Sequence, residues 1–312
     1  MPPSPRIAIV GSLNIDHTFT VDRIPAPGET VTASHSSMSY GGKGANQALA
    51  ACRAGASVAL IGCVGDDFDG RQYQTYLLEA GIDTRGISRI AENDTPTGSA
   101  FIAVESSGEN TIIVNSGANR FLTPKLIDQH ASLIAQSDAL LLQLECPLDA
   151  VARAVRIARD NNILVFINPS PWNETFLETH IDCDCLILNE REAASLVGLD
   201  PFEPSYLAKD LLETARTKCL IVTRGADSVL AIDSNGTVLE ALPPIVSPVD
   251  TVGAGDAFTG AIAVALAEGQ SLSDAIHFAN TAGALATLLP GAQNALPTRE
   301  AIENACPTLP NK

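Results

Sequence analysis

The sequence is short of basic residues and of long apolar runs, and both deficits exclude classes of protein. Lysine and arginine together number 19 against 36 aspartates and glutamates, so the net charge is −17. Nucleic acids and anionic membranes attract basic surfaces, so neither is expected as the main partner, although a local pocket can still hold a small anion. The apolar runs, such as residues 7–10 and 139–142, are far shorter than the roughly 18 residues that span a bilayer. We therefore expect no membrane segment.

Histidine and cysteine are too few or wrongly spaced for a metal-binding or disulfide framework. The five histidines contain no HExxH pair, which leaves zinc catalysis without support. The seven cysteines are odd in number, and Cys183 and Cys185 have the wrong spacing for a zinc knuckle or a thioredoxin-type motif. Residues 1–6 lead into a strand-like run without the apolar region of a signal peptide. These features predict free thiols in a reducing cytoplasm.

What remains is the composition of a globular α/β protein, with 46% apolar and 18% charged residues. Unbroken apolar runs predict buried parallel strands at residues 7–10, 58–61, 139–142, 164–167, 185–188, 219–222 and 229–232. Helical patterns are found at residues 45–54, 70–80, 124–134, 148–160, 206–214, 254–267 and 272–288. The repeated strand–helix order predicts one domain, residues 1–312, with a doubly wound, mostly parallel sheet and helices on both faces.

Two stretches interrupt this order and predict a small β-sheet. Strands are expected at residues 18–21 and 30–34 around a Pro-Ala-Pro-Gly turn, and at 99–104 and 111–114 around a polar turn. Taken together, about 16–38 and 97–116 would form a lid that covers a ligand and excludes water. The alternative is two unrelated surface hairpins.

The first motif with chemical content directly follows the first strand. Asn14 and Asp16 lie where open α/β sheets bind ligands, and an amide with a carboxylate suits hydroxyl groups. The alternative for this segment is an Asx turn or a helix cap.

The second motif is the glycine-rich run at residues 40–47, which enters an alanine-rich helix. Gly42 and Gly44 allow close backbone approach, and the helix N-terminus points amide groups toward a polar ligand. Lys43, one of five lysines, lies between these glycines. The run is not a Walker A loop, and a solvated turn is the alternative.

The third motif opens a long helix at residues 249–260. Gly253, Ala254 and Gly255 form a small-residue loop whose backbone N–H groups predict an anion hole. Asp256 follows in the same turn. An anion hole beside a carboxylate suits phosphoryl transfer, because one part holds the γ-phosphate and the other takes the proton of the attacking hydroxyl.

Further polar residues follow other predicted strands. Glu145 places a carboxylate at the crevice, and the run Thr223–Ser228 is placed to line a nucleotide pocket. Asn189 and Glu192 are three residues apart, so on a helix they share a face and would suit a hydrated Mg²⁺. A helix cap with solvated charges is the alternative for that pair.

These motifs resemble those of the PfkB carbohydrate kinase family. The run Gly-Gly-Lys-Gly-Ala-Asn at 41–46 is similar to the family's N-terminal signature, and residues 250–256 match its C-terminal DTxGAGD signature. Matching features extend from Gly11 to Gly291, nearly the whole chain. The resemblance implies a β lid over the doubly wound core and a homodimer that forms through the lid.

The resemblance also implies roles for individual residues. The expected catalytic residues are the base Asp256 and the anion hole at Gly253, Ala254 and Gly255. The expected sugar contacts are Asn14, Asp16, Gly42, Lys43, Gly44, Asn46, Glu145 and Asp256. The expected ATP contacts are Asn189, Thr223, Gly225, Ala226, Asp227, Ser228, Gly255 and Asn280. Glu192 would bind Mg²⁺, if need be through water.

The resemblance further implies a monovalent cation site for K⁺. Its expected members are Asp250, Val252, Ala286, Leu289, Gly291 and Ala295. Two positions depart from the pattern, since Ala295 stands near a familiar serine and Asn280 stands where a histidine is familiar. Alanine supplies no hydroxyl for the ion, and asparagine stacks poorly on a base.

We therefore expect a cytoplasmic, ATP- and Mg²⁺-dependent sugar kinase that converts D-ribose into D-ribose 5-phosphate and ADP. Another acceptor, such as deoxyribose, fructose or a nucleoside, is the nearest alternative. A non-catalytic sugar or nucleotide sensor on the same fold is a second one, although Asp256 and the anion hole are intact. An NAD-binding enzyme is disfavoured because no GxGxxG follows the first strand.

Overall fold

The computed structural model describes residues 4–105, 109–199, 203–207 and 209–306. Within these residues, nine strands form the main sheet in the order β13-β12-β11-β10-β9-β8-β1-β4-β5. Their bounds are β1 Arg6–Val10, β4 Ser57–Gly65, β5 Asp83–Ile90, β8 Ala139–Leu142, β9 Leu164–Ile167, β10 Cys185–Asn189, β11 Cys219–Thr223, β12 Val229–Asp233 and β13 Val238–Ala241. Neighbouring strands from β5 to β11 run parallel, and β12 is antiparallel to both of its neighbours. The expected doubly wound, mostly parallel sheet is confirmed.

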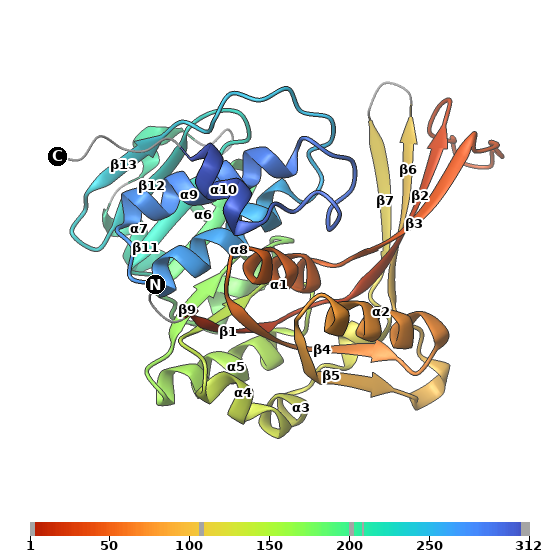
Figure 1. Ribbon diagram of the computed structural model, residues 1–312, viewed down its shortest axis with the longest axis horizontal. Helices are drawn as coiled ribbons and strands as arrows, with labels where there is room; N and C mark the ends of the chain where they lie inside the picture. Colours follow the sequence, from red (N-terminus) through yellow and green to blue (C-terminus); the bar gives the residue numbers. More distant parts are fainter. Residues whose placement is uncertain (1–3, 106–108, 200–202, 208, 307–312) are drawn as a thin grey trace.

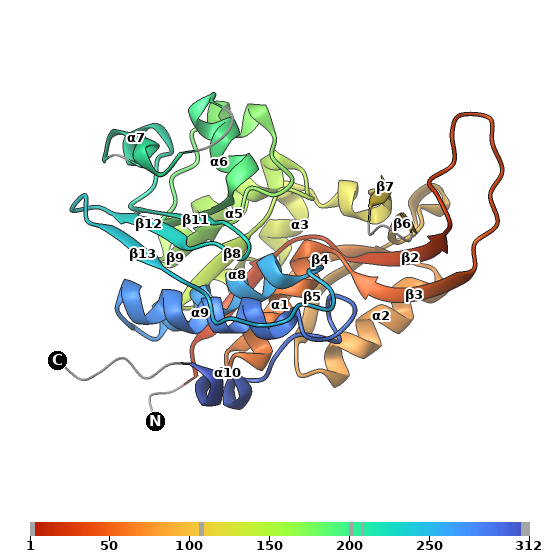
Figure 2. The same cartoon turned by 90° about the horizontal axis from the view of Figure 1, so that it is seen from above.

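Helices cover both faces of this sheet (Figures 1 and 2). One face carries α1 Lys43–Arg53, α2 Phe68–Glu79, α8 Ala254–Ala267, α9 Leu272–Ala286 and α10 Arg299–Ala305. The other carries α3 Pro124–Gln129, α4 Ala131–Ala135, α5 Leu148–Asp160, α6 Glu190–Val197 and α7 Lys209–Thr214. Short 3₁₀ turns lie at Glu92–Asp94, Gly117–Phe121, Glu174–Thr179 and Pro204–Tyr206. Among the described residues, none of the helices combines the length and apolar character that crossing a membrane requires.

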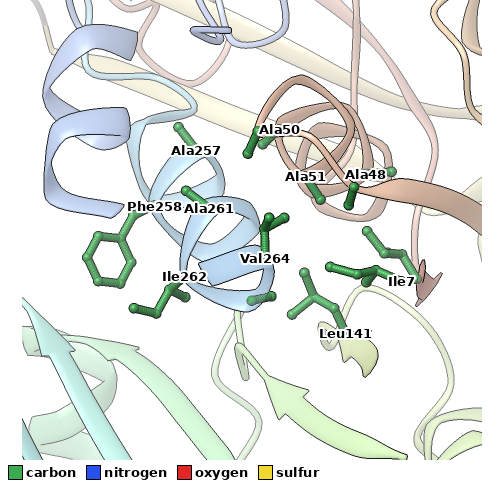
Figure 3. Close-up of a cluster of buried hydrophobic side chains, with 14 of the residues drawn as sticks. Ile7, Ala48, Ala50, Ala51, Leu141, Ala257, Phe258, Ala261, Ile262 and Val264 are labelled. Carbon is green, nitrogen blue, oxygen red and sulfur yellow. The ribbon is translucent and has the colours of Figure 1, made fainter. Parts of the chain in front are cut away.

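Helices α1 and α8 pack closely because their shared surface consists of small side chains. Figure 3 shows Ala50 and Ala51 on the side of α1 next to α8, and a Cβ atom on Gly260 of α8 would lie 2.6 Å from the Cβ of Ala50. Alanine keeps the two backbones near each other and loses no side-chain rotamer freedom on burial. The close packing brings the first turn of α1 beside the first turn of α8, although these segments lie about 210 residues apart in the chain.

A second sheet of four strands projects from the main body, in the order β3-β2-β6-β7 (Figure 1). Its strands are β2 Asn14–Val21, β3 His35–Gly41, β6 Gly98–Glu105 and β7 Asn110–Asn115. All four belong to one hydrogen-bonded sheet, so the alternative of two unrelated hairpins is wrong. The strand expected at residues 30–34 is also wrong. The second strand pairs instead at 35–41, because antiparallel pairing with β2 sets Thr20 opposite His35 and Asn14 opposite Gly41.

Several main-sheet elements escaped the sequence analysis for physical reasons. Strand β5, at the edge beside β4, has the polar sequence Asp-Thr-Arg-Gly-Ile-Ser-Arg-Ile, which carries no apolar run. Strand β13 is short and half-exposed at the opposite edge. The helix expected at 124–134 is divided at His130, and the short helix α10 was not expected.

Candidate active site

The strand order reverses at β1, which lies between β4 and β8, and such a reversal opens a crevice at the carboxyl ends of parallel strands. Three hollows of about 130, 490 and 380 Å³ lie in this region. The smallest is lined by Lys43, Asp256 and the start of α8, and it shares Asn189, Thr223 and Gly255 with the largest. The third is lined by Asn14, Glu145 and lid residue Val114. We call them the transfer, nucleotide and acceptor hollows.

Asn14 and Asn119 form a buried pair beside the acceptor hollow. Asn14 begins strand β2, so the alternative of a helix cap is wrong. Asn119 Nδ2 donates to Asn14 Oδ1 at 2.8 Å, and the Asn119 side chain also bonds both backbone groups of Leu13. Asn119 escaped the sequence analysis because it lies 105 residues away in a 3₁₀ turn. Its contacts fix the orientation of Asn14.

Asp16 points its carboxylate into space that only a glycine leaves free. A Cβ atom on Gly41 would lie 2.0 Å from an Asp16 carboxylate oxygen. Burial, together with the negative charges of Glu145 and Asp256, raises the pKa of Asp16 to about 7. The site therefore holds an unusually basic carboxyl group beside two other carboxylates.

Lys43 is enclosed by carboxylates, so the alternative of a solvated turn does not describe it. Its backbone N–H donates to Glu145 Oε2 at 3.1 Å, and the hydroxyl of Ser12 donates to the same oxygen. Burial alone would lower the pKa of Lys43, but nearby carboxylates, Asp256 foremost, outweigh burial and raise it. Lys43 thus stays a cation at the edge of the transfer hollow.

The start of α8 has the geometry of an anion hole. Gly253 adopts a left-handed conformation with φ of 82°, and a Cβ atom there would also lie 2.9 Å from Ala292. No side chain among the described residues caps this helix end, and the N–H of Ala254 donates to Thr251 at 3.3 Å. The N–H groups of a first helical turn lack partners within the helix, so those of Gly255 and Asp256 can bind an anion.

Asp256 is buried and accepts a hydrogen bond at each carboxylate oxygen. Asn46 Nδ2 donates to Oδ2 and Gln47 Nε2 donates to Oδ1, both at 2.9 Å. The expected sugar contact Asn46 therefore bonds the expected base. Gln47 was not predicted as a site residue. The available signal was its position at the end of the glycine-rich run, directly after Asn46 on α1.

The nucleotide hollow gathers most of the expected ATP residues. Asn189, Thr223, Gly225, Ala226 and Asn280 line it, together with Gly255 and an apolar wall. The wall consists of Val229, Pro243, Pro244, Ile245, Val246, Pro248 and Phe258. Asn280 is buried and donates to the carbonyl of Ala241 at 3.2 Å.

Two expected ATP residues do not line this hollow. Asp227 is exposed, and its backbone N–H closes a turn with Arg224 at 3.0 Å. Ser228 is buried, and its hydroxyl donates to Glu240 across the β12–β13 pair. Both residues belong to the loop after β11, and neither lines the nucleotide hollow.

Asn189 and Glu192 form a capping box at the start of α6, so the helix cap of the alternative is present, but the charge of Glu192 is buried and not solvated. Asn189 Oδ1 accepts from the N–H of Glu192, and Glu192 Oε2 accepts from the N–H of Asn189, both at 2.9 Å. Both residues also line the transfer hollow, and Glu192 is only 5% exposed. The cap therefore holds a carboxylate in place beside the transfer hollow.

The loop of the expected cation site is held by Asp250. Asp250 Oδ1 accepts from the N–H of Val252 at 3.0 Å, and Oδ2 accepts from the N–H of Gly291 at 2.8 Å. The structure thus joins three of the expected residues. Of the other expected members, Ala286 and Ala295 are buried and Leu289 is exposed.

Comparison with known proteins assigns the chain to a class. The model of the pfkB family carbohydrate kinases matches residues 4–299, and the chain belongs to this family. It is 38% identical to the ribokinase of Haemophilus influenzae, over 94% of this chain and 96% of that enzyme.

Solved structures agree on the fold. Ribokinase from Thermotoga maritima superimposes with a TM-score of 0.84 at 34% identity, over 96% of this chain and 98% of that one. Arabidopsis thaliana ribokinase complexed with ribose and ATP gives 0.88 at 26% identity, over 98% and 100%. The ribokinase-like fold, with its nine-stranded sheet and four-stranded lid, is confirmed. Kinases of this family typically depend on Mg-ATP.

Proposed function

We propose that this kinase transfers the γ-phosphoryl group of ATP to the primary hydroxyl of D-ribose, giving D-ribose 5-phosphate and ADP. One observation carries the proposal: Asp256 and the anion hole share one helical turn at the transfer hollow, which adjoins the nucleotide hollow. The ribokinase relatives, one of them complexed with ribose and ATP, support this choice of acceptor.

Asp256 accepts the proton of the primary hydroxyl as that oxygen attacks the γ-phosphorus. The new bond joins the sugar oxygen to phosphorus, and the bond between the γ-phosphorus and the bridging oxygen breaks, leaving ADP. The N–H groups of Gly255 and Asp256 stabilise the charge on the transferring group, and the Lys43 cation adds to this stabilisation.

The residues at the transfer hollow fit Mg²⁺ that arrives with ATP. The described residues contain no group of three or more His, Cys, Asp or Glu side chains arranged to hold a metal. Mg²⁺ at a nucleotide site needs only one or two carboxylates, because phosphates and water complete its shell. Glu192 supplies such a carboxylate, directly or through water, and Mg²⁺ bound there would offset phosphate charge.

The four-stranded lid is proposed to close over the sugar and to form the homodimer. Its strands β6 and β7 expose Phe101, Ile112 and Ile113, of which Ile113 is 66% exposed. A second copy would cover Phe101 and Ile113, which lie opposite each other on one face of the lid. We also propose that residues 1–312 form one cytoplasmic domain with this lid.

We expect Asp16→Ala to lower kcat/KM for D-ribose by roughly 10- to 100-fold, since a buried polar group left unpaired costs about 1–3 kcal/mol. The KM for ATP should stay within about twofold. Steady-state kinetics with each substrate varied in turn measure both. If the KM for ATP rose as much as the KM for D-ribose, Asp16 would not be a sugar contact.

The raised pKa of Asp16 predicts a pH dependence of folding stability. In the native state its pKa is about 7, above the ordinary 3.8, so burial stabilises the protonated form. The contribution of Asp16 to stability is therefore present below pH 4 and is lost as the pH rises through 7. Asp16→Asn should be more stable than the unmodified protein at pH 8 and equal to it at pH 3.5. Urea unfolding at the two pH values measures the difference, and a constant difference would contradict the prediction.

A K⁺ ion behind the anion hole would orient its N–H groups through the Asp250 loop. Backbone carbonyls suit a large, weakly hydrated cation, so K⁺ should activate the enzyme and Na⁺ less so. Ala295→Ser should lower the K⁺ concentration that gives half-activation. The measurement is kcat/KM for D-ribose during a KCl titration at constant ionic strength. A flat response would show that the Asp250 hydrogen bonds alone hold the loop.

The acceptor is tested with a panel of D-ribose, deoxyribose, D-fructose and nucleosides in an ATP-coupled assay. The proposal predicts the highest kcat/KM for D-ribose. A higher value for another acceptor would overturn ribose as the substrate but leave the kinase assignment intact. Absence of transfer to every acceptor would favour a sensor.

A further inference from the structure

Two chains of buried amides end on the carboxylate of Asp256. Behind Asn46, Gln293 Nε2 donates to Asn46 Oδ1 at 2.9 Å, and behind Gln47, Gln143 Nε2 donates to Gln47 Oε1 at 2.6 Å. All four amide residues and Asp256 are more than nine-tenths buried. Each carboxylate oxygen therefore receives one N–H from a chain two amides long.

The direction of both chains follows from the charge on Asp256. An ionised carboxylate has only acceptors, so the neighbouring amides must point their N–H groups toward it. Their own oxygens then face away and need a donor from the next amide. At the far ends, Gln143 Oε1 and Gln293 Oε1 have no hydrogen-bond partner among the described residues. The arrangement satisfies Asp256 and leaves the unpaired acceptors at the ends remote from it.

Further contacts hold the amides in these orientations. Gln47 Nε2 also donates to Asn168 Oδ1 at 3.1 Å, and Asn168 Nδ2 donates to the carbonyl of Ile187 at 2.9 Å. Gln293 Nε2 also donates to the hydroxyl of Tyr73 at 2.6 Å, which in turn donates to the carbonyl of Gly41 at the same distance. Helices α1 and α2, the residue after β9 and the middle of β10 thus support one carboxylate.

We propose that Gln47 and Gln293 are positioning residues that hold the carboxylate of Asp256 oriented for proton acceptance. The proposal rests on the proposed function, in which Asp256 takes the proton of the sugar hydroxyl. Neither glutamine lines any of the three hollows, so each acts through another side chain. Gln47 acts on Asp256 directly, and Gln293 acts through Asn46.

The test uses Gln47→Met and Gln293→Met, which remove the amide and keep a side chain of similar length. Gln270→Met is the matched control, because Gln270 bonds Glu268 beyond the far end of α8. We expect kcat to fall about 10- to 100-fold for Gln47→Met and about 3- to 10-fold for Gln293→Met, since hydrogen bonds to charged groups are strong. The KM values for D-ribose and ATP should stay within about threefold.

The pH profile distinguishes positioning from a merely structural role. Losing an N–H donor favours the protonated carboxyl group, so the acid limb of the kcat profile should move to higher pH in both variants. Gln270→Met should leave kcat and the profile unchanged. A lower kcat with an unmoved profile would overturn the proposal, and so would unchanged kcat in both glutamine variants. If Gln47→Met does not fold, Gln293→Met carries the same test.

A double-mutant cycle separates this proposal from the function on which it rests. In an Asp256→Asn background, Gln47→Met should lower the residual kcat by less than about threefold, because residues that act through one another are not additive. A full additional loss would overturn the positioning role. If Asp256→Asn alone keeps more than a tenth of kcat, the proposed base itself is wrong.

Discussion

Replacing Asp256 by asparagine is expected to lower kcat by at least about 100-fold, because losing a general base costs about 10²- to 10⁴-fold. Asparagine keeps the size of the side chain but cannot accept the proton. It also brings a new N–H₂ group against the donors of Asn46 and Gln47, which bond the two carboxylate oxygens in the native protein. ATP binding should be nearly unchanged, since Asp256 does not line the nucleotide hollow.

Single-turnover kinetics with ATP and D-ribose measure this loss, and ATP titration calorimetry measures binding. Asp149→Asn is a suitable control, because Asp149 also lies in the first turn of a helix, α5, but on the other face of the sheet. The control should retain full activity. An Asp256→Asn enzyme with more than a tenth of the native kcat would show that another group takes the proton.

Lys43→Met is expected to lower kcat by about 100-fold, because one preorganised donor to a transferring group is worth about 10²- to 10³-fold. Among the described residues that line the transfer hollow, Lys43 alone carries a positive charge. The surrounding carboxylates hold it protonated, and raise its pKa against the effect of burial. Without this cation, no positively charged side chain of the transfer hollow would offset the charges of Glu192, Asp256 and the γ-phosphoryl group.

The salt dependence of the Lys43→Met effect provides a further check. Lys43 is partly buried, and a partly buried charge is screened much less by added salt than an exposed one, so the loss should be nearly the same at 50 and 500 mM salt. Lys125→Met, at an exposed position of α3, should leave kcat unchanged. A Lys43→Met enzyme with altered KM for D-ribose and unaltered kcat would assign Lys43 to sugar binding alone.

The sequence predicted those parts of the fold that carry a strong apolar pattern. Strands at 139–142 and 164–167 and helices at 148–160 and 254–267 agree with the structure at both ends. Each carries an unbroken apolar run or a helical pattern in the core. Strand β3 carries no such pattern, because its seven residues include three serines and are mostly exposed. Its position depends on pairing with β2, which is information that a local pattern does not contain.

The candidate site was predicted where its residues lie in glycine-rich loops. Asn14, Lys43 and Asp256, which lie in or directly beside the predicted glycine-containing motifs, line the acceptor and transfer hollows. Gln143 and Gln293 were missed, because a glutamine in an apolar context carries no signal until the fold places it beside another amide. The hydrogen bond between Gln293 and Asn46 joins residues 247 positions apart, and only the packing of the helices brings them together.

Phosphorus NMR of a reaction containing the protein, ATP, Mg²⁺, K⁺ and D-ribose tests the central claim most directly. The account predicts that the γ-phosphate signal is replaced by one phosphomonoester, coupled to the two C5 protons of ribose, in amounts equal to the ADP formed. It also predicts that both products are absent with Asp256→Asn over the same period. Inorganic phosphate with no sugar phosphate, or a sugar phosphate formed equally well by Asp256→Asn, would contradict the account.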